Sequence, residues 1–255
     1  MARFDLTDFE WELIQPLLPN KPRGVARVDD RRVLNGIFWG LRTGSPWRDL
    51  PERYGPHTTI YNRFNRWAKA GVWVQVFETR SEKSPDSMQF IDSSIIRAHQ
   101  HAAAGKKGGE DHAIGRSRGG LSTKINAMVD HRGLPVAITL SAGQTSDKAA
   151  VADLLAAHPA PGDVVADRGY DARAILELIA AHGGRGHIPT QRDRKAQRSV
   201  DAAVYRQRNL VERYFNKLKH FRKVATRYEK TARNYHAAVL LASSRLWLRF
   251  YEAAS

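Results

Sequence analysis

"MQFIDSSIIRAH" (Met88–His99) places one acid, Asp92, inside an otherwise apolar segment. A phenylalanine and an isoleucine precede this aspartate, and two further isoleucines follow it, a composition typical of a β-strand. Burying a carboxylate in a strand is costly unless the carboxylate is paired or holds a metal ion. The segment therefore predicts a strand with an acidic site on it.

Segments further along the chain extend this strand into a sheet. "KINAMVDHRG" (Lys124–Gly133) and "LPVAITLSAG" (Leu134–Gly143) are expected to form a hairpin that turns at Asp130–Gly133. A helix, a buried strand in "GDVVADRGYD" (Gly162–Asp171), a second helix, a short strand and mostly helix from about Val200 are expected to follow. This order predicts an α/β fold, with a mixed sheet that helices flank.

The first 80 residues indicate a small all-helical domain. Thr7 and Glu10 form a capping-box pattern at the start of the first helix. The third helix, "HTTIYNRFNRWAKAG" (His57–Gly71), carries Arg63 and Arg66 away from its apolar stripe. A helix-turn-helix-like module that contacts DNA is therefore expected, although a helical domain with a solvated basic face fits the composition equally well.

The polar stretch "SEKSPDS" (Ser81–Ser87) is expected to link this domain to the second one. The division predicted from the sequence is therefore a helical DNA-binding domain at 1–80 and an α/β domain at 81–255 that carries the acidic site of Asp92.

The charge of the chain favours polyanionic partners. Lys and Arg number 41 against 26 Asp and Glu, which gives a formal net charge of +15. Nucleic acid is the first expected partner and an anionic membrane surface the second. No apolar run is long enough to span a bilayer, and the N-terminus carries acids where a signal peptide would be apolar. A cytoplasmic protein that binds nucleic acid is expected.

Two more acids join Asp92 as candidates for a site. Asp167 follows the apolar residues of the buried strand and precedes Gly169. Glu212 is the only acid among seven Arg and Lys residues in "YRQRNLVERYFNKLKHFRK" (Tyr205–Lys223). A DNA-binding surface alone would not need this acid. An ion pair of Glu212 with a neighbouring arginine on a solvated helix is the simpler alternative.

Metal-assisted phosphoryl transfer would explain three acids among so many bases. The chain has no cysteine, so a metal must be held by carboxylates, histidine or backbone oxygens. Mg²⁺ prefers carboxylate oxygens, and two such ions about 4 Å apart can hold the attacking and leaving oxygens of a phosphodiester. The surrounding cations would bind the flanking phosphates. Two Mg²⁺ ions, with Mn²⁺ as a substitute, are expected at Asp92, Asp167 and Glu212.

Between the first two strands lies a basic glycine-rich stretch at 98–124, which shows no period and is expected to be a functional or disordered loop. Arg116, Arg118 and Lys124 in it are candidates to hold DNA phosphates. The three histidines of the stretch suggest DNA contact more readily than a zinc site; they are His99, His101 and His112. Asp147, at the start of a helix, is a further acid that could approach the site.

The three acids, in chain order, resemble the DDE triad of transposases that have a ribonuclease-H-like core. The spacing of Tyr205, Arg208, Glu212 and Lys219, with two, three and six residues between them, resembles the C-terminal signature of the bacterial insertion-sequence-four and -five superfamily. If this region were one continuous helix, the four side chains would share a face.

Other segments resemble members of the insertion-sequence-five type, namely "GRSRGGLSTK" (Gly115–Lys124) and "DRGYD" (Asp167–Asp171). The N-terminal "LTDFEWELIQPLLP" and "GSPWRDLPERYGPHTTIYNRFNRWAKAG" are similar to the helical region of the same group. The resemblance extends over nearly the whole chain.

The resemblance implies a bacterial, nucleoid-associated DNA transposase. Such an enzyme binds terminal inverted repeats and cleaves the element's ends with a divalent metal. The freed 3′-hydroxyl then attacks target DNA. By position, the three acids would be catalytic metal ligands, while Tyr205, Arg208 and Lys219 would support the site or hold DNA. A homodimer or higher multimer on paired ends is expected.

Two other functions remain open from the sequence. One is a catalytically inactive regulator that binds DNA through its N-terminal helices. The other is a ribonuclease-H-like nuclease that cuts nucleic acid without strand transfer.

Overall fold

The computed structural model describes residues 3–19, 27–81, 88–103, 112–158 and 162–255. The chain divides into two compact units. The helical unit comprises Met1–Arg80, His99–His112 and Leu218–Ser255, and the sheet unit comprises Ser81–Ala98 and Ala113–Lys217. The last part of the chain thus groups with the N-terminal helices, which the sequence did not suggest. The functional boundary near residue 81 remains a prediction.

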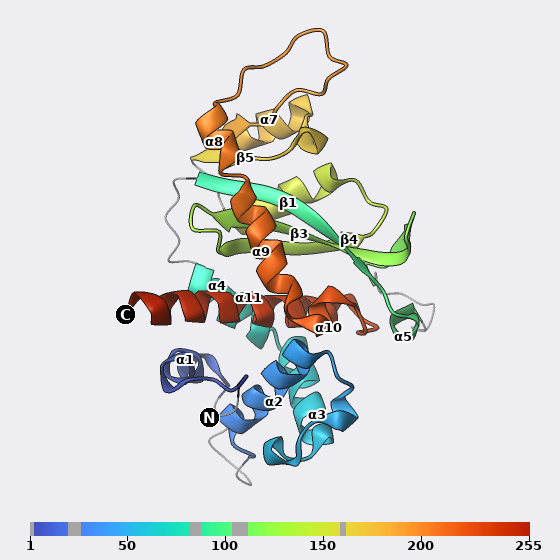
Figure 1. Ribbon diagram of the computed structural model, residues 1–255, viewed down its shortest axis with the longest axis vertical. Helices are drawn as coiled ribbons and strands as arrows, with labels where there is room; N and C mark the ends of the chain where they lie inside the picture. The colour runs from blue at the N-terminus through green and yellow to red at the C-terminus, as the bar shows by residue number, and fades with distance from the viewer. Residues whose placement is uncertain (1–2, 20–26, 82–87, 104–111, 159–161) are drawn as a thin grey trace. The chain divides into compact units, whose positions relative to one another are not determined.

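The sheet unit contains a six-stranded mixed sheet in the order β2-β3-β1-β5-β6, with β4 paired to β3 (Figure 1). Strand β3 pairs antiparallel with β1, β2 and β4, whereas β5 pairs in parallel with β1 and β6. The mixed sheet predicted from the sequence is confirmed. The bounds are β1 Met88–Arg97, β2 Gly115–Ser117, β3 Gly120–Asp130, β4 Pro135–Ala142, β5 Asp163–Val165 and β6 Arg185–His187.

The hairpin between β3 and β4 turns where the sequence predicted. The Asp130 carboxylate accepts the backbone N–H groups of Arg132 and Leu134, both at 2.9 Å. Gly133 has φ of +74°, a left-handed conformation that glycine adopts without strain. The turn residues therefore fix the register between β3 and β4.

Helices of the sheet unit cover the sheet through apolar faces. The 3₁₀ turn η4 (Asp147–Ala150) leads into α6 (Val151–Ala157), which packs on β4 and β3. The turn η5 (Arg168–Tyr170) precedes α7 (Arg173–Ala181), which packs on β6. Helices α8 (Ala202–Arg206) and α9 (Asn209–Lys219) follow the sheet.

The stretch at 98–124 is not uniformly irregular, contrary to expectation. Gly115–Ser117 pairs antiparallel with Gly120–Ser122, which forms the β2–β3 hairpin at the edge of the sheet. A short helix, α5 (Gln100–Ala103), lies near its start. Residues 104–111 of the predicted loop lie outside the described residues.

The helical unit is built on α2 and the long C-terminal helix. The α2 helix packs on α3 and α10, and α11 packs on α1, α2, α3 and α10. The all-helical N-terminal region is confirmed, although 13 residues (44–56), including the turns η2 (Trp47–Asp49) and η3 (Glu52–Tyr54), separate α2 from α3. The helices are α1 Asp8–Ile14 (continued by η1 Gln15–Leu17), α2 Asp30–Thr43, α3 His57–Lys69, α4 Val72–Ser81, α10 Arg222–Ala225 and α11 Ala232–Ala254.

The capping box at the start of α1 is present, and its acid has a second role. Glu10 accepts the N–H of Thr7 through one carboxylate oxygen. The other oxygen accepts Arg245 Nε at 2.6 Å, and both side chains are buried. Arg245 also donates to the carbonyls of Phe4 and Asp5, at 3.2 and 2.8 Å. This buried ion pair fastens the N-terminal segment to α11.

Arg63 does not lie on the exposed face that the sequence predicted. Its guanidinium is buried, pairs with Asp30 at the start of α2, and lies 5.1 Å from the centre of the Trp67 ring. Asp30 supplies the counter-charge that makes this burial tolerable. Arg66 on the same helix is exposed, as predicted, and Lys69 is exposed too.

Across the described segments, no helix combines the length and apolarity that crossing a membrane requires.

Candidate active site

The register of the sheet places Asp92 and Asp167 next to each other. Phe90 in β1 pairs in parallel with Val165 in β5. Asp92 lies two residues beyond Phe90, and Asp167 lies two residues beyond Val165, so both acids reach the same level on neighbouring strands. Asp167 therefore stands just past the carboxyl end of β5, where ligands of α/β sheets commonly bind.

The turn after β5 fixes the Asp167 side chain. Its Oδ1 accepts the N–H of Gly169 at 2.7 Å and caps η5. A Cβ at Gly169 would lie only 2.9 Å from that oxygen. Glycine is therefore the residue that lets the backbone N–H approach this carboxylate closely.

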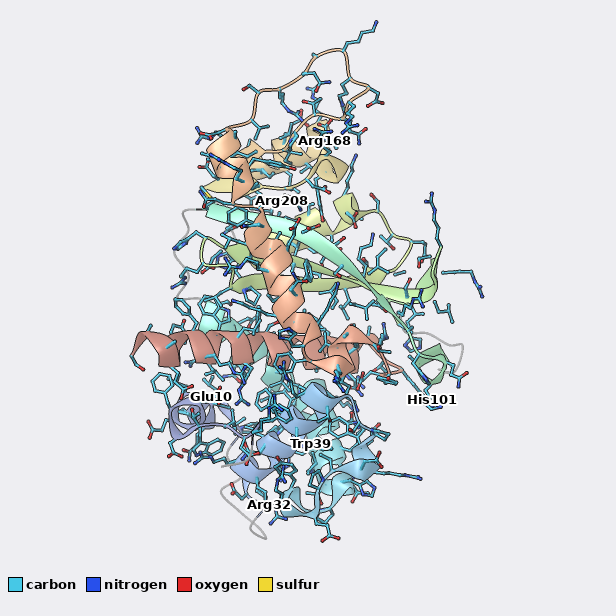
Figure 2. All side chains as sticks on the ribbon, in the orientation of Figure 1. Glu10, Arg32, Trp39, His101, Arg168 and Arg208 are labelled. Carbon is cyan, nitrogen blue, oxygen red and sulfur yellow. The ribbon has the colours of Figure 1, made fainter. Side chains whose placement is uncertain are left out.

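Arg208 connects the third acid to the first. Its Nη1 donates to Asp92 Oδ2 at 3.0 Å, and its Nη2 pairs with the Glu212 carboxylate four residues further along the chain. Figure 2 labels Arg208 among the side chains of the protein. The ion pair of Arg208 with Glu212 that the sequence left as an alternative is thus present. Its guanidinium also reaches Asp92, so this is not an isolated surface pair.

Burial and neighbouring charge perturb this group of side chains. Burial raises the pKa of Asp92, although the Ser93 N–H and Arg208 oppose the rise, and the charge of Asp167 adds to it. Burial works against the charge of Arg208, but Asp92 and Glu212 outweigh it and raise its pKa. Arg208 therefore stays charged and pairs with Asp92, while the neighbouring Asp167 adds a second negative charge.

The helix carrying the signature residues is broken, contrary to the expectation of one continuous helix. Helix α8 ends at Arg206, and α9 begins at Asn209. Between them the hydrogen bonds span three residues, from Arg208 N–H to Tyr205 O at 3.0 Å and from Val211 N–H to Arg208 O at 3.2 Å. This tightening places Tyr205 in α8, whereas Glu212 and Lys219 belong to α9.

A buried lysine and a further acid support the strand that carries Asp92. Lys124 Nζ donates to Asp147 Oδ1 and to the carbonyl of Thr145, both at 2.6 Å. Asp147 Oδ1 also accepts the Ser93 hydroxyl at 2.6 Å, and the Ser93 N–H donates to Asp92 Oδ1 at 2.8 Å. Lys124 is buried, so it acts inside the protein rather than on its surface.

Tyr170 is a neighbour of the site that the sequence did not single out by itself. Tyr170 is the last residue of η5, in the "DRGYD" segment, and its side chain is buried. Burial raises the pKa of its phenol, and the charges of Asp147 and Asp92 add to the rise. Tyr170 is therefore a neutral hydroxyl next to the acids. Only the folded structure shows that Tyr170 lies near these acids.

The remaining basic candidates lie in different places. Arg116 and Arg118 are exposed on and beside β2, and Lys219 is exposed at the end of α9. Tyr205 is partly buried, and its phenol contributes to the raised pKa of Arg208. The structure thus brings Tyr205 to the acids, and it leaves Arg116 and Arg118 on the β2–β3 hairpin.

Carboxylate oxygens suit a hard divalent ion, although the Arg208 guanidinium pairs with both Asp92 and Glu212. Among the residues with described positions, no three His, Cys, Asp or Glu side chains converge closely enough to hold a metal ion, and this includes His99, His101 and His112. Asp92 in β1 and Asp167 just past the end of β5 still offer carboxylate oxygens. These oxygens are the ligands that Mg²⁺ prefers.

Two protein families match the chain, one for each predicted domain. Residues 6–77 match the family described as "Putative transposase of IS4/5 family", and residues 83–247 match the family described as "Transposase DDE domain". The N-terminal helices and the sheet with its acids therefore each resemble parts of transposases.

Curated relatives and a solved structure agree with these matches. The chain is 35% identical over 130 residues to a putative transposase for insertion sequence element IS6501 of Brucella ovis, covering 51% of this chain and 100% of the relative. It is 39% identical over 130 residues to the 16.2 kDa protein of insertion element IS402 of Burkholderia cepacia, covering 46% and 86%.

The solved structure is a piggyBac transposase synaptic complex with hairpin DNA. Its TM-score is 0.51 at 9% identity, over 96% of this chain and 71% of that one. At this identity the likeness concerns the fold alone. It confirms the ribonuclease-H-like sheet with flanking helices that the resemblance implied.

Proposed function

The chain belongs to the DDE transposases of the IS4/5 family, and we propose that it cleaves the ends of an insertion sequence and joins them to target DNA. The observation that carries this proposal is the parallel register of β1 and β5, which sets Asp92 beside Asp167. Arg208 then ties Glu212 to the same place. We propose on this basis that the three acids, which come from separate elements, serve one site.

Asp92, Asp167 and Glu212 would hold the divalent metal of this site, which we expect to be two Mg²⁺ ions with Mn²⁺ as a substitute. When bound, the metal would polarise the scissile phosphate and activate the attacking oxygen. Asp167 is already oriented by the Gly169 N–H, and Asp92 by the Ser93 N–H. Arg208 neutralises Asp92 and Glu212 in the protein alone, and it is charged and placed to bind a DNA phosphate.

DNA is the proposed partner, as terminal inverted repeats and as target. The exposed Arg116 and Arg118, together with Lys219 and Arg66, are the cations we assign to phosphate contact. Arg63 and Lys124 are left out because both are buried in ion pairs. We propose that the active form is a homodimer or higher multimer on paired ends, in the bacterial cytoplasm.

The test is a cleavage and joining assay on a duplex that carries the element's own terminal repeat. Wild-type protein should nick at the repeat boundary with Mg²⁺ or Mn²⁺, but not with EDTA, and should yield joined DNA when target is added. Cleavage without joined product would favour the nuclease. Binding without cleavage under every metal condition would favour the inactive regulator.

Replacing Lys124 by methionine is expected to lower the rate of end cleavage by about 10- to 100-fold, the usual loss when a partner behind a ligand is removed. The reason is that Asp147 loses the ammonium that holds it in place to accept the Ser93 hydroxyl, next to Asp92. Single-turnover cleavage measures the rate, and anisotropy checks that repeat binding is unchanged. Lys195→Met, on an exposed loop lysine, is the control. An unaltered rate in Lys124→Met would contradict the proposed support.

Replacing Arg116 and Arg118 together by alanine is expected to lower the affinity for the terminal repeat. It is also expected to reduce the salt dependence of that affinity. Each guanidinium that contacts a phosphate adds about one unit to the slope of log affinity against log salt, so the slope should fall by about two. Fluorescence anisotropy over a KCl series measures it. Arg173→Ala serves as the control, since Arg173 is exposed but paired with Glu177. A slope equal to that of wild type would remove the hairpin from the DNA interface.

A further inference from the structure

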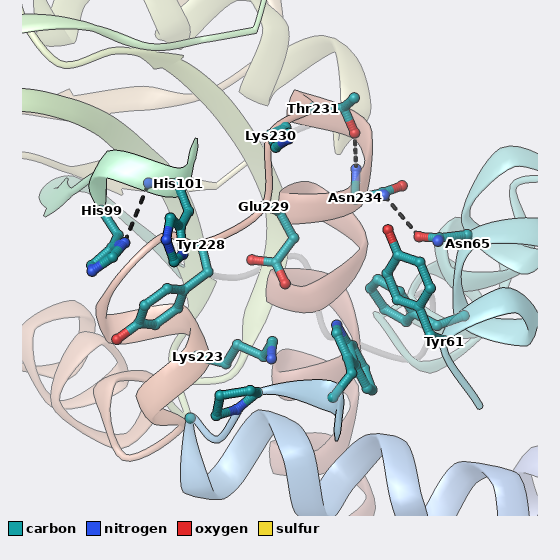
Figure 3. A pocket seen from close by; sticks show the side chains of 14 residues that line it. Tyr61, Asn65, His99, His101, Lys223, Tyr228, Glu229, Lys230, Thr231 and Asn234 are labelled. Atoms are coloured by element: carbon teal, nitrogen blue, oxygen red, sulfur yellow. Dashed lines mark hydrogen bonds between the residues drawn. The ribbon is translucent and has the colours of Figure 1, made fainter. Parts of the chain in front are cut away.

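The helical unit contains a cavity of about 720 Å³ that the proposed cleavage chemistry does not use. Three separate parts of the chain line it, at 44–65, 99–101 and 223–234 (Figure 3). Its volume lies within the range of pockets that hold small organic ligands. The cavity therefore has room for a nucleotide-sized group.

Aromatic rings form one side of this cavity. Trp47 lies with its ring centre 5.8 Å from that of Tyr61 and 5.6 Å from that of Phe64. Lys223 Nζ lies 4.5 Å from the Trp47 ring centre and donates to the carbonyl of Ser45 at 3.0 Å. The lysine is thereby held at the wall of the cavity, and it forms no ion pair with any acid in the described part of the chain.

A second group of rings lies on another side, as Figure 3 shows for Tyr228, His99 and His101. The His99 ring centre is 5.0 Å from that of Tyr228 and 4.7 Å from that of His101. The N–H of His99 donates to the carbonyl of Arg227 at 2.9 Å, which fixes His99 beside Tyr228. Flat surfaces therefore line the cavity on both sides of Glu229.

Two hydrogen-bond acceptors in the cavity have no donor among the described residues. Glu229 Oε2 is buried without a hydrogen bond, and so is Asn234 Oδ1. The amide nitrogen of Asn234 is already used, since it donates to Asn65 Oδ1 at 2.8 Å. Burial raises the pKa of Glu229, while the charge of Lys223 and the backbone N–H groups of Glu229 and Tyr228 favour its carboxylate form. Buried acceptors without donors are costly, so a ligand that brings N–H groups would be favoured.

We propose that this cavity binds an unpaired guanine of DNA, stacked on its aromatic rings, with the guanine N–H groups donating to Glu229 and Asn234. The proposal rests on the proposed function, because it takes DNA as the partner. Stacking on aromatic side chains is available to every base, so the rings alone would not choose among them.

The two acceptors would make the cavity prefer guanine over the other bases. Guanine presents N1–H and its 2-amino group side by side, so it brings two donors to a cavity that holds two acceptors. Adenine and cytosine each place a ring nitrogen acceptor beside their amino group, and thymine flanks its single N–H with carbonyls. These bases would set an acceptor against the Glu229 carboxylate. Lys230 is exposed at the cavity and can pair with the phosphate of the bound nucleotide.

The experiment measures binding of fluorescent duplexes that carry one bulged guanine, inosine, adenine or thymine, in EDTA so that no cleavage occurs. Inosine lacks only the 2-amino group of guanine. The guanine bulge should bind about tenfold more tightly than the inosine bulge, the discrimination expected for one lost base contact. Guanosine monophosphate, followed by quenching of tryptophan emission, tests whether the base binds without the strand.

Glu229→Gln should weaken the preference for guanine, because one of the two carboxylate oxygens becomes an NH₂ donor, while affinity for the fully paired duplex should persist. Glu12→Gln, an exposed acid of α1, is the control and should keep the preference. Equal affinity of wild type for all four bulges would overturn the proposal, whatever the variants do. So would an undiminished preference in Glu229→Gln.

Failure of this proposal can be distinguished from failure of the proposed function. Metal-dependent end cleavage with no base preference would reject the guanine site alone. A wild-type protein that binds neither the duplexes nor guanosine monophosphate would reject both.

Discussion

Asp167→Asn is expected to lower the rate of DNA end cleavage by roughly a thousandfold, while binding of the terminal repeat stays intact. Losing one carboxylate ligand removes several kcal/mol of charge stabilisation from the metal site, and each 1.4 kcal/mol is tenfold in rate. Asparagine keeps the size and the oxygen that accepts the Gly169 N–H. The loss would therefore report charge rather than a changed turn.

The measurement is single-turnover cleavage with saturating protein, in Mg²⁺ and in Mn²⁺. Asp153→Asn provides the matched control, since Asp153 is an exposed acid on α6 of the same unit. Asp92→Asn should give a loss of the same order. Cleavage by Asp167→Asn at a rate within a few fold of wild type would remove Asp167 from the catalytic set.

Arg245→Ala is expected to lower the free energy of unfolding of the helical unit by about 3–5 kcal/mol, the usual effect of breaking a buried ion pair. The substitution leaves Glu10 buried without its counter-charge, and it strips two donors from the carbonyls of Phe4 and Asp5. The N-terminal segment would thereby lose its attachment to α11.

Tryptophan fluorescence during urea unfolding can follow this unit specifically. All six tryptophans of the chain lie in it, at Trp11, Trp39, Trp47, Trp67, Trp73 and Trp247. Arg173→Ala breaks an exposed i,i+4 pair in the sheet unit and should leave the tryptophan transition unchanged. An Arg245→Ala protein that unfolds at the wild-type urea concentration would contradict the stabilising role of the pair.

The sequence predicted the elements that depend on local chemistry. Asp92 in an apolar strand, the glycine turn at Gly133 and the capping box of Thr7 and Glu10 all lie where expected. Each of these features is encoded by residues within a few positions of one another. The strand after Gly162 was equally visible, and its parallel pairing then brought Asp167 to Asp92.

Features that depend on distant residues were not predictable in this way. Arg63 and Lys124 were expected to contact DNA. Both are buried instead, and each pairs with an aspartate that lies 33 or 23 residues away in the chain. The β2–β3 hairpin forms in a glycine-rich stretch without alternation, because β3 supplies a long paired edge. The pairing of Arg208 with Asp92 joins residues 116 apart, and no helical spacing reveals it.

The most direct test of the three-acid site is a crystal structure of the protein with Mn²⁺ and a cleaved terminal-repeat end, read by anomalous scattering. We predict Mn²⁺ peaks bound by Asp92 and Asp167, with Glu212 released from Arg208 and turned to the metal. Mn²⁺ bound elsewhere, with Arg208 still joining Asp92 to Glu212 beside the DNA end, would contradict the assignment of these acids as metal ligands.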